Sequence, residues 1–407
     1  MSLLRDRRLA ALLAAEVVSS LGTQMTWLVL PWFVLRETGS PQRMTWVIIA
    51  EVVPVGVLGF FGGAIAGRVG TRRTMLACDL LRAPILAAIP ALDAAGALPF
   101  PALLALVAAT GLFLAPYFSV QRAVVPELIG EEHADVAQAT ALFQAANRLT
   151  IFLGPPLAGV LIGVIGTARV LYLDAASYLV SFALVGLFVH PPETKLDGPP
   201  AGVLDGVRFL LRDRLLRVWT PAFTVIDICW QLIFASLPVL VVTTYHANPR
   251  ILGWLFGAFG GGALVGAFAS MPVVRRFEAL GLGATAFVFE IASLWILAIP
   301  ARWEVAFAGM ALAGFCTSIV NAPMQSLVTL RIPRDVRMQG MAAFSVFQCI
   351  GSPAGLLLAG WALARYDTHS VLAVVLALDT IAAAAFVVSS LAERSTLRAA
   401  ASLDSPA

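Results

Sequence analysis

Three of the charged residues that stand inside otherwise apolar stretches could take part in proton transfer. Glu16 and Asp227 are acidic, and Arg148 is basic. Burial favours the neutral form of a carboxylate and a nearby arginine favours its charged form, so a carboxylate that alternates between these settings carries a proton. We expect Glu16 or Asp227 to be that carrier and Arg148 to compete as its partner. A fixed salt bridge is the alternative for each of the three.

The sequence contains no motif for nucleotide hydrolysis, for nucleophilic catalysis or for metal binding. Lys195 is the only lysine and follows Thr194, so the chain has no Gly-Lys loop for nucleotide phosphates. The sequence contains neither HExxH nor GxSxG, and its cysteines form no CxxC pair. We therefore expect no enzymatic activity, cofactor, metal or nucleic-acid partner. The cysteines read as packing residues: Cys78, Cys229, Cys316 and Cys349.

The elements that position the charged residues must be membrane helices. The chain is 59% hydrophobic and 13% charged, whereas soluble domains carry about 25% charged residues. A spanning helix needs about 20 apolar residues, and about twelve runs qualify. We expect an all-α membrane protein with spans at 9–35, 44–66, 74–95, 100–120, 135–165, 168–189, 216–245, 251–274, 280–300, 303–325, 336–365 and 370–391.

A charged, proline-rich break divides these spans into two sets of six. Residues 190–217 hold the break, so we expect an N-terminal bundle at 1–189, a cytoplasmic linker, and a C-terminal bundle with a short tail at 218–407. Placing both termini in the cytoplasm puts most of the 27 basic residues on that side. The halves would then be parallel repeats in the cell (inner) membrane of a monomeric protein.

The spans differ in the faces they present. Polar and aromatic residues recur at helical spacing in the first, fourth, seventh and tenth spans, and lipid would reject such faces. We expect them to line a substrate cavity, although hydrogen bonding between neighbouring helices is the alternative. The candidate lining residues are Thr23, Gln24, Trp27, Phe113, Tyr117, Trp230, Gln231, Asn321, Met324 and Gln325.

Other spans carry different signals. Small residues every fourth position in the second, fifth, eighth and eleventh spans favour close helix contacts. Asp79 and Arg82, three residues apart, read as a structural pair. Asp174, Glu290 and Asp379 fall in the sixth, ninth and twelfth spans, which we expect to line no cavity.

Several motifs resemble those of the major facilitator superfamily, from about residue 9 to residue 391. Ser20-Leu21-Gly22 with Pro31 in the first span is similar to that family, as is Gly63-Ala-Ile-Ala-Gly-Arg-Val-Gly-Thr-Arg-Arg73, which resembles its G-x-x-x-D-R-x-G-R-R signature. The likeness is greatest to the bacterial exporters that include macrolide efflux proteins and the enterobactin exporter.

The resemblance implies roles in conformational change for two sets of residues, a cytoplasmic gate and a helix break. A cytoplasmic gate would use Arg68, Gly70, Arg72 and Arg73, and Asp79 would replace the signature carboxylate that is Gly67 here. Residues 154–159 resemble the antiporter signature G-P-x-x-G-G, with Ala158 in place of one glycine. Its helix-break candidates are Gly154, Pro155 and Pro156.

These observations favour a secondary transporter that exports a bulky hydrophobic or amphipathic small molecule, such as a drug, antibiotic or siderophore, in exchange for protons. Its partners would be that molecule, a proton or other coupling cation, and the lipid bilayer. An uptake symporter or lysophospholipid transporter of the same fold is one alternative. A membrane receptor that transports nothing is the other.

Overall fold

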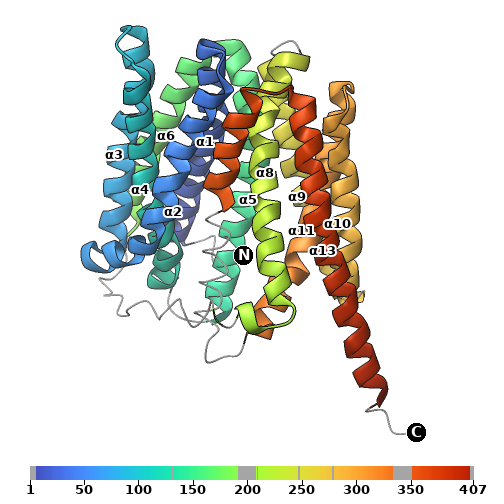
Figure 1. Cartoon of the computed structure of the whole chain (residues 1–407). Helices are drawn as coiled ribbons and strands as arrows, with labels where there is room; N and C mark the ends of the chain where they lie inside the picture. The colour runs from blue at the N-terminus through green and yellow to red at the C-terminus, as the bar shows by residue number, and fades with distance from the viewer. Residues whose placement is uncertain are drawn as a thin grey trace. The chain divides into compact units, whose positions relative to one another are not determined.

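The computed structural model describes residues 6–129, 133–190, 208, 210–245, 248–276, 279–332 and 351–403, and every regular element among them is a helix (Figure 1). The chain divides into two compact units. The first comprises Met1–Gly198 with Asn248–Gly257, and the second comprises Pro199–Ala247 with Ala258–Ala407. Most of the predicted linker and the first part of the predicted eleventh span lie outside the described residues.

The main segment of the first unit folds into six helices, in which α1 packs on α5 and α6, α2 packs on α4, and α3 packs on α4 and α6. Single residues, Gly70 and Gly166, separate α2 from α3 and α5 from α6. Their φ angles of 90° and 83° lie in the region that glycine tolerates best. The six are α1 (Arg7–Thr38), α2 (Pro41–Val69), α3 (Thr71–Ala94), α4 (Phe100–Ile129), α5 (His133–Ile165) and α6 (Thr167–Phe188).

Helix α5 corrects one prediction. The chain remains α-helical through Gly154, Pro155 and Pro156, with no break there. The glycine instead serves helix packing, because a Cβ atom on Gly154 would lie 2.5 Å from the Cβ atom of Gln24 on α1. The motif therefore brings two helices together, as small residues do in membrane bundles.

The second unit contains α8 packed on α13, and α10 packed on α11 and α13. Glycines again allow close approach: a Cβ atom on Gly262 or Gly266 of α9 would overlap backbone carbonyls of α11. The helices are α8 (Leu216–Thr244), α9 (Pro249–Arg276, from Ala258 in this unit), α10 (Ala279–Leu294), the 3₁₀ turn η2 (Trp295–Ala298), α11 (Trp303–Arg331), the helix Gly351–Leu363 and α13 (Thr368–Leu403).

The outward faces of these helices are apolar. On α13, Val374, Ile381 and Val388 are 62–67% exposed and seven residues apart, so they form one stripe, while Leu372 and Phe386 are fully buried. Such an apolar surface is unfavourable in water and favourable in contact with lipid chains. Among the described residues, nine helical segments are long and apolar enough to cross a membrane. The protein is a multi-pass membrane protein, as the composition predicted.

An ion-pair cluster joins three segments of the second unit. The Nε atom of Arg331, at the end of α11, lies 2.9 and 2.8 Å from the two carboxylate oxygens of Asp213, and its Nη1 atom lies 2.6 Å from Oε1 of Glu393 on α13. Asp213 also accepts hydrogen bonds from the backbone N–H groups of Leu215 and Leu216, where α8 begins. Burial lowers the pKa of Arg331, but the two carboxylates raise it by more.

We expect Arg331→Gln to destabilise the protein by about 2 kcal/mol, because the ion pairs with Asp213 and Glu393 are lost together. Thermal unfolding in detergent measures the change. Arg302→Gln is the matched control, since Arg302 is 84% exposed in its pair with Glu304, and exposed pairs contribute little. Equal melting temperatures for the two variants would contradict the prediction.

Candidate functional site

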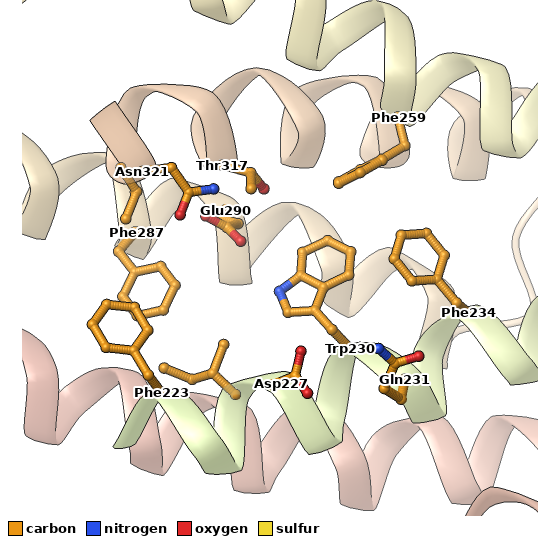
Figure 2. A pocket seen from close by; sticks show the side chains of 12 residues that line it. Phe223, Asp227, Trp230, Gln231, Phe234, Phe259, Phe287, Glu290, Thr317 and Asn321 are labelled. Atoms are coloured by element: carbon orange, nitrogen blue, oxygen red, sulfur yellow. The ribbon is translucent and has the colours of Figure 1, made fainter. Parts of the chain in front are cut away.

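A pocket of about 300 Å³ opens inside the second unit, among α8, α9, α10 and α11 (Figure 2). Five of its twelve lining residues are aromatic and two are acidic, and none is basic. The lining residues are Phe223, Ile226, Asp227, Trp230, Gln231, Phe234, Phe259, Phe287, Glu290, Thr317, Val320 and Asn321.

Helix α8 supplies half of the pocket wall. Its lining residues fall within two adjacent rows of the helix, which places them on one helical face. The helix Gly351–Leu363, which packs against α8, holds two of them: Ser352 donates to Asp227 Oδ2 at 3.0 Å, and Gln231 donates to Ser352 at 2.9 Å. Gly351 makes room for this contact, because a Cβ atom there would lie 2.9 Å from Asp227 Oδ2.

Aromatic rings close the pocket at both ends, as Figure 2 shows. At one end Trp230, Phe234 and Phe259 contact one another, with ring centroids 5.0–5.3 Å apart. At the other end stand Phe223 and Phe287, each packed on the buried ring of Phe386. Their flat, electron-rich faces suit a large apolar molecule or an organic cation.

Glu290 is the most deeply buried acid of the pocket, at 2% exposure. Thr317 of α11 and the indole N–H of Trp230, which points toward it in Figure 2, are its hydrogen-bond partners. Its Oε2 atom has no hydrogen-bond partner within the described part of the chain. The expectation that Glu290 lines no cavity is wrong: α10 packs along α11, and this carboxylate stands on the face that the two helices share.

A second polar centre lies within the first unit, around Arg82 of α3. This side chain is 1% exposed. Its guanidinium lies 4.0 Å from the centre of the Tyr178 ring, and its Nη2 atom donates to the Tyr178 hydroxyl at 2.6 Å. Tyr178 donates in turn to Asp174, which also accepts from Thr26 and from Ser177. An arginine, a tyrosine and a carboxylate thus form one buried chain.

Three further carboxylates border this centre. Asp79, fully buried on α3, accepts a hydrogen bond from Ser181 at 2.7 Å and lies within electrostatic reach of Arg82 and Glu16. Glu16 accepts from Ser20 at 2.6 Å. Glu51 of α2 lies within reach of Arg82 and Asp174. The predicted pair of Asp79 and Arg82 therefore belongs to a larger network.

The structure places the predicted cavity residues in several settings. Asp227, Trp230, Gln231 and Asn321 line the pocket, whereas Met324 is buried in the apolar core beside it. In the first unit, Tyr117 and Phe113 belong to an apolar core cluster, and Thr23 bonds to Arg82 and Tyr178. Gln24 lies against Gly154, the Trp27 side chain is half exposed, and the side chain of Gln325 lies outside the described residues.

The predicted proton-coupling and gate residues are likewise dispersed. Glu16 is buried in the first unit, Asp227 stands in the second, and the Arg148 side chain is exposed on α5. Arg72 donates to the Gly186 carbonyl at 2.6 Å and Gly70 precedes α3, while the side chain of Arg73 is exposed. The side chain of Arg68 lies outside the described residues.

Sequence reasoning passed over Glu290, Asp174 and Arg82 as functional candidates. One signal was available for α6: Asp174, Ser177, Tyr178 and Ser181 recur on one side of the helix, which marks a polar face as clearly as the α8 stripe did.

Comparison with known proteins assigns the chain to a family. The model of the Major Facilitator Superfamily matches residues 12–246 and 220–405. The "Multidrug efflux pump Tap" of Mycolicibacterium fortuitum is 23% identical over 86% of this chain and 88% of its own. The "Multidrug efflux protein YfmO" of Bacillus subtilis is 26% identical over 85% of this chain and 84% of its own.

Solved structures show the same fold. A point mutant of the nucleoside transporter NupG superposes with a TM-score of 0.78 at 11% identity, covering 94% of this chain and 99% of its own. A bacterial homologue of the iron transporter ferroportin, in its inward-facing state, gives 0.75 at 16% identity, covering 96% and 100%. The chain belongs to the major facilitator superfamily, and it is a membrane transporter rather than an enzyme.

Proposed function

We propose that this transporter exports a bulky amphipathic cation from the cell in exchange for protons. It would act as a monomer in the cell membrane, with two six-helix halves that open alternately to either side and with both termini in the cytoplasm. The observation that carries the proposal is the pocket of the second unit, where the carboxylate of Glu290 is buried among aromatic rings.

The residues that line the pocket favour a substrate that is positively charged as well as large. Asp227 and Glu290 are acidic, and no lysine or arginine stands among the twelve lining residues, so an anion would find no positive partner there. A bound cation would supply the counter-charge that lets the buried acid ionise, and it would also gain from the ring faces. A sugar-sized polar substrate fits poorly, because the described lining residues include few neutral polar side chains: Gln231, Thr317 and Asn321, with the indole of Trp230.

The relatives support the direction of transport. Two of the similar proteins are named as multidrug efflux proteins, and each is similar over most of its length. Efflux of many compounds suits a pocket that recognises charge and apolar surface rather than a fixed pattern of hydrogen bonds.

Purified protein in liposomes tests the proposal. With an acidic lumen, we expect a fluorescent organic cation such as ethidium to accumulate inside, because protons leaving the lumen drive its entry through molecules whose cytoplasmic side faces outward. A proton ionophore should abolish accumulation, and an anionic dye of similar size should not accumulate. Accumulation that ignores the pH gradient would overturn proton exchange, and loss of preloaded cation down the proton gradient would indicate symport.

A further inference from the structure

The polar centre of the first unit holds more acid than its base can balance. Glu51, Asp79 and Asp174 surround Arg82, and all four residues are at most 6% exposed. Arg82 is within electrostatic reach of all three carboxylates, and it is the only arginine or lysine that reaches any of them among the described residues. One guanidinium balances one carboxylate, so two of the three have no positive partner in that part of the chain.

Hydrogen bonds identify the carboxylate that keeps its charge. Asp174 accepts from three hydroxyl groups, those of Thr26, Ser177 and Tyr178, and the last of these also accepts from Arg82. Donors aimed at a carboxylate stabilise its ionised form, and donors polarised by a cation do so most strongly. Helix α1 approaches closely here, because a Cβ atom on Gly22 would overlap the Asp174 carboxylate.

The other two acids are poorly supplied with donors. Glu51 has the indole of Trp27. Asp79 has Ser181 on one oxygen, while its Oδ1 atom has no hydrogen-bond partner in the described part of the chain. An extra anion buried without a counter-charge costs several kcal/mol, and taking up a proton avoids that cost. A protonated acid carries no charge, so it loses less than an anion does in surroundings that offer it few donors.

Several helices of the first unit contribute titratable groups around Glu51 and Asp79. Helix α1 contributes Glu16, which lies near Asp79, and α4 contributes Tyr117, whose buried hydroxyl lies near Asp79 and Ser181. Apart from the carboxylate of Glu16, none of these neighbours is a base that would draw the proton away, and a proton shared between Glu16 and Asp79 stays within the centre. The titratable and charged groups facing the centre are Glu16, Glu51, Cys78, Asp79, Arg82, Tyr117, Asp174 and Tyr178.

We propose that Glu51 and Asp79 are protonated acids that flank a charged Arg82–Asp174 pair, and that the first unit thereby stores the protons that transport exchanges. The exchange role rests on the proposed function, whereas the storage does not. When the centre is exposed to water, each acid can ionise and release its proton to the solvent. Before the centre closes again, each acid takes up a proton from the water that it then faces, because burial as an anion would be costly.

Infrared spectroscopy of the purified protein in detergent at neutral pH tests the storage. Protonated carboxyl groups absorb in a carbonyl band that ionised groups lack. We expect the wild-type protein to show this band, and Glu51→Gln and Asp79→Asn each to remove about one acid group from it. Glu37→Gln is the matched control, since Glu37 is exposed at the end of α1 and should leave the band unchanged. A band that neither substitution reduces would overturn the proposal.

The melting temperatures of Glu51→Gln and Asp79→Asn provide a second test of the proposed protonation. Glutamine and asparagine nearly match the shape of a protonated acid, so both variants should fold and melt close to the wild-type temperature. A variant that fails to fold, or that melts much lower, would show that the native group is charged and would also overturn the proposal. If the infrared band behaves as expected but the liposomes show no gradient-driven transport, the storage stands and the proposed function fails.

Discussion

Replacing Glu290 by glutamine is expected to weaken the binding of an organic cation to the second unit by about 10- to 100-fold. The substitution keeps the shape of the side chain and removes the charge that Glu290 takes on when a bound cation supplies its counter-charge. A hydrogen bond or ion contact to a charged group contributes about 1.5–3 kcal/mol, and each 1.4 kcal/mol is a factor of ten in affinity. Because Trp230 stands beside Glu290 in the pocket, quenching of tryptophan fluorescence by a bound aromatic cation measures the change.

Two comparisons separate charge from packing. Glu290→Asp keeps the charge and should retain most of the affinity, whereas Glu304→Gln alters a half-exposed acid at the start of α11 and should change nothing. An uncharged analogue of the ligand should bind the wild type and Glu290→Gln equally. If Glu290→Gln binds the cation as tightly as the wild type, the pocket does not recognise charge through this carboxylate.

An alanine in place of Gly22 is expected to cost about 3 kcal/mol of stability and to abolish transport. Its Cβ atom would overlap the carboxylate of Asp174 and lie 2.5 Å from the hydroxyl oxygen of Ser177, so α1 and α6 must separate. Separation breaks the hydrogen bond from Thr26 and leaves buried charge without its donors, which adds to the ordinary cost of overpacking. Thermal unfolding and the liposome assay measure the two effects.

Gly186→Ala on α6 is the matched control. A Cβ atom there would meet only a methyl group of Leu76, at 3.7 Å, which is ordinary contact. Alanine is the better helix former by about 1 kcal/mol, so this variant should be neutral or slightly stabilised. Should Gly22→Ala melt no lower than Gly186→Ala, the close contact between Asp174 and α1 has no energetic weight.

The fold could be read from the sequence because it depends on local regularities. Apolar runs of about 20 residues specify membrane helices whatever surrounds them. The α8 stripe of Asp227, Trp230 and Gln231 was legible for the same reason: side chains three or four residues apart share a face, and that face does line a pocket. Glycine spacing predicted close helix contacts, and Gly351 and Gly355 make such contacts with α8.

What the sequence did not reveal depends on which helix stands opposite. Glu290 looked like an isolated charge in an apolar run, and only the packing of α10 on α11 turns it toward a pocket. Arg148 and Arg82 look alike as lone arginines, yet one is exposed and the other fully buried beneath Tyr178. Pro155 and Pro156 suggested an interruption, but the helix accommodates both. Which helices pack against each other is a property of the tertiary structure, and residue spacing along one helix does not predict it.

The aromatic pocket and the arginine centre belong to different units and share no side chain, and under the proposed function this separation has a consequence for how resistance would evolve. Substitutions that alter which compounds are recognised can accumulate on α8, α9, α10 and α11 without touching the side chains around Arg82. Selection on a new toxic compound should therefore yield changes at positions such as Phe223, Phe259 and Asn321, while Glu51, Asp79 and Asp174 stay invariant among the survivors. A lineage could broaden its chemical repertoire and keep the same source of energy.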